Sequence, residues 1–212
     1  MDGHPPARRG RIRGRLAAGA LVVAAMLPSC AAGPTGDQLY AQAREANLLF
    51  KQSVATVLLH IEDGDWQVQE YGDMPVTCDG GYSFSMHRTT FEGWTLDADA
   101  STTGRRLAEW LRSRGWNTRD VATGADGAVV VEASDRAVGV ATLTIDIRDG
   151  EASADAVGVG ATSTCYDGDP GALAAILYPR SGDRPREHEP LPVVEAAGAR
   201  PVFGFTEDGE PR

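Results

Sequence analysis

The chain has 212 residues, a length typical of one domain with enough residues to form a hydrophobic core. Five of its 20 basic residues and one of its 30 acidic residues precede Cys30, so the chain that begins at Cys30 has 15 basic and 29 acidic residues, a net charge of −14. Such an acidic surface repels phosphate backbones and anionic headgroups, which argues against nucleic-acid binding and electrostatic docking to membranes.

Residues 1–29 have the layout of a bacterial signal peptide. An arginine-rich stretch, Arg8–Arg15, precedes an apolar run, Leu16–Leu27, and Ser29 comes directly before Cys30. The apolar run is about a dozen residues long, whereas a helix needs roughly 20 residues to cross a bilayer. We therefore expect this segment to be cleaved.

The segment Leu27-Pro28-Ser29-Cys30 resembles the lipobox of bacterial lipoproteins, although Pro28 departs from the usual pattern. The resemblance implies lipidation of the Cys30 thiol by a diacylglyceryl group, and two acyl chains suffice for stable anchoring. We expect a lipoprotein-type signal peptide over 1–29, a lipidated tether over 30–36 and an extracytoplasmic protein anchored to the cell membrane. The alternative is an ordinary secretory signal followed by an incidental cysteine.

Two further cysteines, Cys78 and Cys165, are expected to form a disulfide in an oxidising compartment. Closing a loop of this length stabilises a fold by roughly 4–5 kcal/mol at most. A reactive or metal-binding thiol pair is the alternative, but neither cysteine has another cysteine or a histidine at zinc-ligand spacing.

The first predicted element is a helix of up to seven turns. Thr35 and Gln38 fit a capping box, and Asp63-Gly64-Asp65 supplies a stop. Apolar residues recur at intervals of three and four, as on one face of a helix: Leu39, Ala43, Ala46, Phe50, Val54, Val57 and Ile61.

Two strands and a second helix follow. Alternating residues predict strands over 66–71 and 82–90, separated by a break at 72–75. The second helix is expected over 103–114, with a serine or threonine cap before it and Gly115 at its end.

From Trp116 the period changes to two, which indicates an antiparallel meander. The predicted strands are 116–122, 128–134, 138–148 and 151–159. The whole order predicts a single α+β domain over residues 37–178, in which an antiparallel sheet of about five or six strands packs on a long N-terminal helix and a second short helix.

Residues 179–212 contain six prolines and little periodicity, and are expected to form a proline-rich flexible tail. The apolar groups Val193-Val194 and 202–205 within it are interpreted as coil, with a partner-binding peptide as the alternative.

Asp97, Asp99 and Ser101 match the first ligand positions of a calcium loop, but Thr102 replaces the required glycine and Ala108 the final carboxylate. An acidic turn that caps the second helix explains these residues more simply. We expect no metal site, no cofactor and no cofactor-binding residue.

The histidines His60, His87 and His188 fall in a predicted helix, a strand and the tail, so none are spaced to share a metal within one element. Neither Gly-x-Ser-x-Gly nor Ser-x-x-Lys occurs, and we identify no catalytic residue. A catalytic triad assembled from residues far apart in the sequence is the alternative.

Gly158-Val159-Gly160 contains two glycines of a phosphate-binding loop but lacks the third, and is interpreted as a loop or bulge. The four tryptophans are interpreted as core residues, with the wall of a carbohydrate or lipid pocket as the alternative: Trp66, Trp94, Trp110 and Trp116.

The lipobox, the early long helix, the segment 66–78 and the late Cys165 together resemble uncharacterised small actinobacterial cell-envelope lipoproteins. The resemblance implies an envelope protein and assigns no catalytic residue. We expect a non-enzymatic binding or interaction module whose partner is an envelope lipid, glycan or protein, with an envelope hydrolase as the alternative.

Overall fold

The computed structural model describes residues 33–124, 127–150, 155–178, 192–206 and 210–212, all within one compact unit, Gly33–Arg212. The expected signal peptide, residues 1–29, and the expected lipidation site, Cys30, lie outside the described residues.

The described residues contain three α-helices and a short 3-10 turn, namely α1 (Asp37–Ile61), α2 (Ala100–Ser113), α3 (Pro170–Leu177) and η1 (Arg136–Val138). Ten strands accompany them: β1 (Asp65–Glu70), β2 (Pro75–Cys78), β3 (Gly81–Thr89), β4 (Asn117–Thr118), β5 (Ala122–Thr123), β6 (Val129–Asp135), β7 (Val140–Arg148), β8 (Ala156–Ser163), β9 (Tyr166–Asp167) and β10 (Val194–Ala196).

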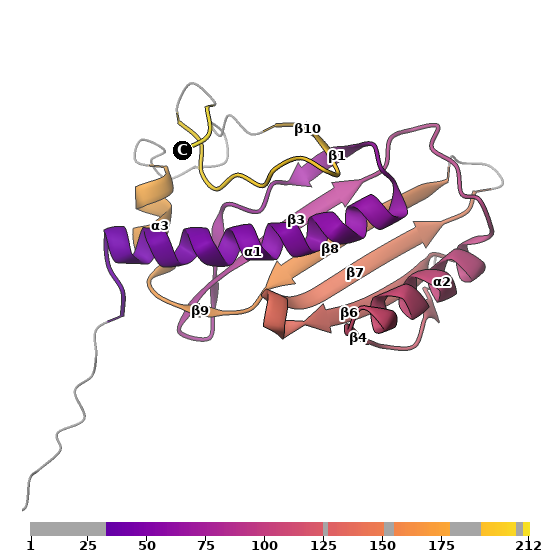
Figure 1. The fold of residues 1–212 in the computed structure, drawn as a ribbon, viewed down its shortest axis with the longest axis horizontal. Helices are drawn as coiled ribbons and strands as arrows, with labels where there is room; N and C mark the ends of the chain where they lie inside the picture. Colours follow the sequence, from indigo (N-terminus) through magenta and orange to yellow (C-terminus); the bar gives the residue numbers. More distant parts are fainter. Residues whose placement is uncertain (1–32, 125–126, 151–154, 179–191, 207–209) are drawn as a thin grey trace, which may run out of the picture. The chain divides into compact units, whose positions relative to one another are not determined.

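The strands form one antiparallel sheet in the order β10-β1-β3-β8-β7-β6-β4, with β2 and β9 paired to β3 and β5 paired to β6 (Figure 1). The predicted α+β class, with an antiparallel sheet on a long first helix, is confirmed. The sheet has ten strands among the described residues rather than five or six, and a third helix is present. The additional strands are two to four residues long, too short to show a period of two.

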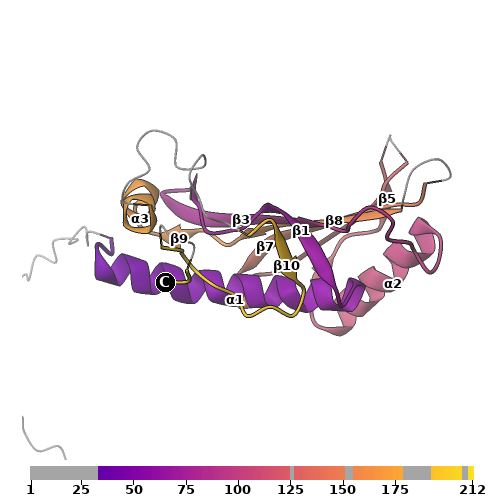
Figure 2. The ribbon, with the colours of Figure 1, turned by 90° about the horizontal axis from the view of Figure 1, so that it is seen from above.

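Helices α1 and α2 lie on the same face of the sheet (Figure 2). On β7, Leu143, Ile145 and Ile147 are fully buried beneath them, whereas Thr144 and Asp146 point to the other face and are half-buried. The core therefore lies between this sheet face and the two helices.

Helix α1 buries the apolar face that its sequence predicts, including Leu39, Phe50 and Val54. The expected capping box is wrong, because Gly36 is the N-cap and no side chain caps the first turn. Gly36 has a φ of 57°, a conformation that favours glycine.

Helix α2 begins three residues earlier than predicted, and the expected serine or threonine cap is wrong. The Asp99 carboxylate is the cap and accepts a hydrogen bond of 2.8 Å from the Thr102 amide. The interpretation of the acidic turn as a helix cap is thereby confirmed. Gly115, with a φ of 90°, follows the helix end as expected.

The interpretation of Gly158-Val159-Gly160 as a loop or bulge is wrong, because these residues lie inside β8. Gly158 pairs with Thr89 on one side and with Asp146 on the other, and Gly160 pairs with His87 and Thr144. Hydrogen bonding to two neighbouring strands holds this segment extended despite the weak strand propensity of glycine.

The expectation of a flexible tail over 179–212 is also wrong for residues 192–206. Strand β10 pairs with β1, in the register Trp66 to Glu195, and so forms one edge of the sheet. Ala197 and Phe203 are only 3% and 2% exposed and belong to the hydrophobic core. The domain therefore extends beyond the expected boundary at 178, while residues 179–191 and 207–209 lie outside the described residues.

Among the helices of the described segments, none combines the length and apolar character required to span a bilayer.

Candidate functional site

The cysteines at positions 78 and 165 form the expected disulfide. Cys78 ends β2, and Cys165 lies between β8 and β9, so the bond joins the end of β2 to the β8–β9 connection. Because both strands β2 and β9 pair with β3, the disulfide fixes a region that is already assembled. This geometry supports a structural role.

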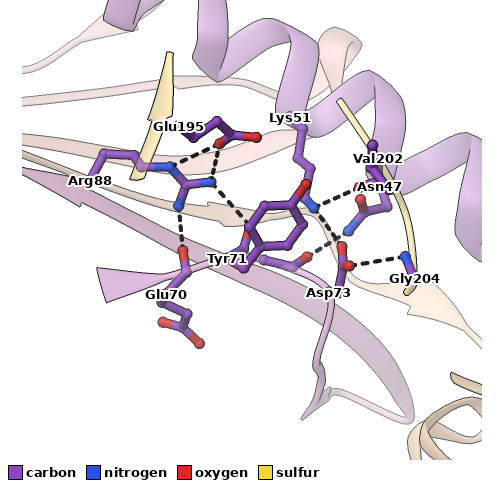
Figure 3. Close-up of polar contacts among 10 residues, drawn as sticks. Asn47, Lys51, Glu70, Tyr71, Asp73, Arg88, Glu195, Val202 and Gly204 are labelled. Atoms are coloured by element: carbon purple, nitrogen blue, oxygen red, sulfur yellow. Dashed lines mark hydrogen bonds and ion pairs between the residues drawn. The ribbon is translucent and has the colours of Figure 1, made fainter. Parts of the chain in front are cut away.

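A group of polar side chains lies buried between α1, the sheet and the C-terminal segment (Figure 3). We call it the buried polar cluster: Asn47, Lys51, Tyr71, Asp73, Arg88 and Glu195.

Lys51 is at the centre of this cluster and is only 4% exposed. Its ammonium group pairs with Asp73 and donates a hydrogen bond of 2.8 Å to the Val202 carbonyl. The same nitrogen lies 3.6 Å from the centre of the Tyr71 ring, a cation–π contact. The second oxygen of Asp73 accepts a hydrogen bond of 2.9 Å from the Gly204 amide.

Arg88, on β3, is 1% exposed and forms the other ion pair of the cluster. Its Nη2 and Nε donate to one carboxylate oxygen of Glu195 at 2.7 and 3.2 Å. Its Nη1 donates to the Glu70 carbonyl at 2.6 Å. Glu195 comes from β10, so both ion pairs depend on the C-terminal segment for hydrogen-bond partners.

Burial is the main cause of the pKa shifts in the cluster. It lowers the pKa of Lys51 to about 8, and the nearby Asp73 carboxylate opposes part of that shift. Burial likewise raises the pKa of Asp73, with Lys51 acting in the opposite direction. Burial also raises the pKa of Tyr71, assisted by the negative charge of Glu195.

The cluster has little room for a substrate. A cavity of about 20 Å³ adjoins Lys51, Arg88 and Glu195, which is space for about one water molecule. The charged groups are instead bonded to the C-terminal segment through Glu195, Val202 and Gly204. We therefore interpret the cluster as the attachment of that segment to the domain.

The sheet face opposite α1 and α2 carries a larger groove, which we call the sheet groove. Its volume is about 300 Å³, at the lower end of the range for small-molecule sites. It is lined by His87, Thr89, Asp146, Arg148, Ala156, Val157 and Gly158. His87 and Thr89 of β3 thus lie on one side of the β8 backbone, and Asp146 and Arg148 of β7 lie on the other.

Gly158 forms part of the floor of the sheet groove, and the fold does not require glycine there. Its φ is not positive, and a Cβ atom would meet its nearest neighbour, His87 Nε2, at an ordinary contact distance of 3.4 Å. Glycine inside a strand weakens it and often marks a place where a ligand approaches the backbone. The groove is therefore open to the backbone of β8 at this position.

The four tryptophans occupy the core or its boundary, as predicted. Trp66 is fully buried and Trp116 is 9% exposed, while Trp94 and Trp110 are partly buried against the core. Trp110 and Trp116 also line a common groove of about 220 Å³ beside α1. Of the four tryptophans considered as a pocket wall, Trp66 and Trp94 do not line this groove.

The predicted site residues are otherwise dispersed. His60 lies on α1 and His87 on β3, and His188 is outside the described residues. No group of three potential metal-binding side chains occurs in the part of the chain that the structure describes.

Comparisons with known proteins assign no family. No family model and no curated protein matches the chain. One solved structure, of a DUF4853 family protein from Actinomyces odontolyticus ATCC 17982, is similar with a TM-score of 0.36 and 11% sequence identity. The similarity covers 60% of this chain and 67% of that chain. Its source is an actinobacterium, and no activity is assigned from it.

Proposed function

We propose that this protein is an extracytoplasmic lipoprotein, anchored through Cys30, whose domain binds a polar ligand in the sheet groove. The signal-peptide layout and the lipobox resemblance of residues 27–30 support the location. The disulfide between Cys78 and Cys165 also supports it, because such bonds persist in oxidising compartments.

The observation that carries the binding proposal is Gly158 at the floor of a groove with charged and hydroxyl-bearing walls. Without a side chain at this position, a ligand reaches the backbone of β8. His87, Thr89 and Asp146 then supply hydrogen-bond donors and acceptors around it. The acidic character of the chain disfavours polyanions as ligands.

Replacing Cys30 tests the anchor. Cys30→Ala should move the protein from the membrane fraction to the soluble extracytoplasmic fraction, because the thiol that accepts the lipid is gone. Cell fractionation and labelling with radioactive palmitate measure this in the native host. Cys78→Ala is the matched control and should keep its label. A Cys30→Ala protein that stays in the membrane fraction would contradict the anchor.

Replacing Gly158 tests the sheet groove. Gly158→Val should fill the floor while leaving the free energy of unfolding within about 1 kcal/mol of the original, because valine favours strands. A thermal-shift screen against envelope saccharides, glycerol phosphates and short peptides would give stabilising ligands for the original protein.

Gly160→Ala is the matched control, since Gly160 faces the same side of β8 but does not line the groove. Ligands should be lost with Gly158→Val and retained with Gly160→Ala. Equal ligand binding by both variants would exclude the sheet groove as the site.

A further inference from the structure

A second groove lies on the helical side of the sheet, between α1, the C-terminal end of α2 and η1. Its volume is about 220 Å³. We call it the indole groove, and its walls are Ser53, Thr56, Val57, Trp110, Arg114, Trp116, Asp135 and Val138. It is separate from the sheet groove, with which it shares no residue.

The indole groove contains one cationic and one anionic side chain that do not neutralise each other. Arg114 and Asp135 form no ion pair with each other or with any other residue in the described ranges. One Asp135 oxygen accepts a hydrogen bond from the Ala137 amide, which orients the carboxylate. The guanidinium of Arg114 lies 5.4 Å from the centre of the Trp110 ring. Both charges are therefore available to a ligand.

The aromatic wall is held in place before any ligand arrives. The His60 ring stacks on Trp110 with a centroid distance of 3.8 Å and an interplanar angle of 7°. Trp116 is only 9% exposed and belongs to the hydrophobic core, which holds its ring in place. Within the described residues neither indole N–H has an acceptor, in contrast to Trp66 and Trp94, which both donate to Glu62. A rigid wall lowers the entropic cost of binding.

Two hydroxyl groups complete the polar lining. Ser53 and Thr56 each donate a hydrogen bond to a carbonyl one turn earlier in α1, and the Ser53 hydroxyl also lies 3.2 Å from the Val138 carbonyl of η1. Because the donor is used within the helix, the oxygen lone pairs of Ser53 and Thr56 remain as acceptors. The groove thus combines acceptors on Ser53, Thr56 and Asp135 with the donors of the Arg114 guanidinium.

We propose that the indole groove binds a saccharide ring. A sugar ring has apolar C–H groups for the partly exposed Trp110 and Val138, and hydroxyl groups that both donate and accept hydrogen bonds. A volume of about 220 Å³ is below the roughly 300–1,000 Å³ of sites for drug-sized ligands, which suits one ring better than a lipid chain. This proposal is independent of the sheet groove.

The test uses the intrinsic fluorescence of the full-length protein in detergent, titrated with methyl glucoside, methyl mannoside, methyl galactoside and N-acetylglucosamine. At least one sugar should change the emission saturably. Arg114→Gln and Asp135→Asn should each weaken that affinity at least tenfold, because each removes a charge-assisted hydrogen bond. Asparagine at 135 can still accept the hydrogen bond from the Ala137 amide, so the turn is preserved.

Arg112→Gln is the matched control, since Arg112 is an exposed residue of α2 that does not line the groove. It should bind the sugar with unchanged affinity, and so should Gly158→Val, which separates this site from the sheet groove. A protein that responds to no sugar in the panel overturns the proposal. The proposal is also overturned if Arg114→Gln and Asp135→Asn bind the sugar with unchanged affinity. It is overturned as well if only free amino acids, used as competing probes, change the fluorescence.

Discussion

At the scale of the residue, Lys51 shows how the core uses charge. It is the only lysine of the chain, and it is buried beside Asp73 with hydrogen bonds that reach the C-terminal segment. Burying two charges costs desolvation energy that their attraction does not necessarily recover. The hydrogen bonds from Lys51 to the Val202 carbonyl and from the Gly204 amide to Asp73 hold residues 202–204 in place.

The titration of Lys51 makes a prediction about pH. The pKa of Lys51 is about 8 in the folded protein, whereas the ordinary lysine value is 10.5. Between these pH values the unfolded chain therefore binds more protons than the folded protein. The free energy of unfolding should therefore rise with pH, by roughly 1–2 kcal/mol between pH 7.5 and 9.5. This pH range stays below the ordinary tyrosine pKa of 10. At higher pH the raised pKa values of Tyr71 and Tyr82 would make the free energy of unfolding fall and so oppose the effect of Lys51.

Urea unfolding at the two pH values measures this effect. The control is the double variant Lys51→Met with Asp73→Asn, which removes both charges and leaves no unpaired ion in the core. Its stability should change less over the same range. A protein whose stability falls between pH 7.5 and 9.5 would show that the Lys51 ammonium is not disfavoured by folding.

At the scale of the element, the C-terminal segment is an integral part of the domain. Strand β10 covers the edge of β1, and Phe203 packs against Tyr40 and Phe84 with ring centroids 5.7 and 5.6 Å apart. The segment thus provides both an edge strand and a core side chain. The sequence showed the apolar groups at 193–194 and 202–205, but it did not show that they belong to the domain, because prolines and charges dominate the surrounding residues.

Truncating Phe203 tests this packing. Phe203→Ala should lower the free energy of unfolding by about 3–5 kcal/mol, the cost of removing a buried aromatic ring. Val193→Ala is the matched control, since Val193 is in the same segment and 77% exposed, and it should change stability by less than about 0.5 kcal/mol. Urea unfolding followed by fluorescence compares them. If Phe203→Ala lowers the free energy of unfolding by as little as Val193→Ala, the segment does not pack on the domain.

At the scale of the whole molecule, the sheet separates two kinds of surface. One face is covered by α1 and α2, with the indole groove at the junction of the helices. The other carries the sheet groove above the backbone of β8. Each of the two proposed binding sites therefore has a face of the sheet to itself, so each can be altered without changing the other.

The sequence by itself determined the features that depend on neighbouring residues. The period of three and four from Leu39 to Ile61 identified α1, and the period of two around β7 identified a sheet with one buried face. The chain has three cysteines, and the resemblance of residues 27–30 to a lipobox set Cys30 apart, which predicted the pairing of Cys78 with Cys165 that the structure shows. Each of these signals lies in local pattern or in simple counting.

Only the tertiary structure decided which distant residues meet. Strand β10 has three residues and acquires its conformation from pairing with β1, and Gly158 is extended because β3 and β7 hold it on both sides. The convergence of Lys51 with Asp73, and of Trp110 with Asp135, likewise has no local signature. The physical reason is that hydrogen bonding across strands and burial of side chains act between residues far apart in the chain, and they override the weak local preferences of glycine- and proline-rich segments.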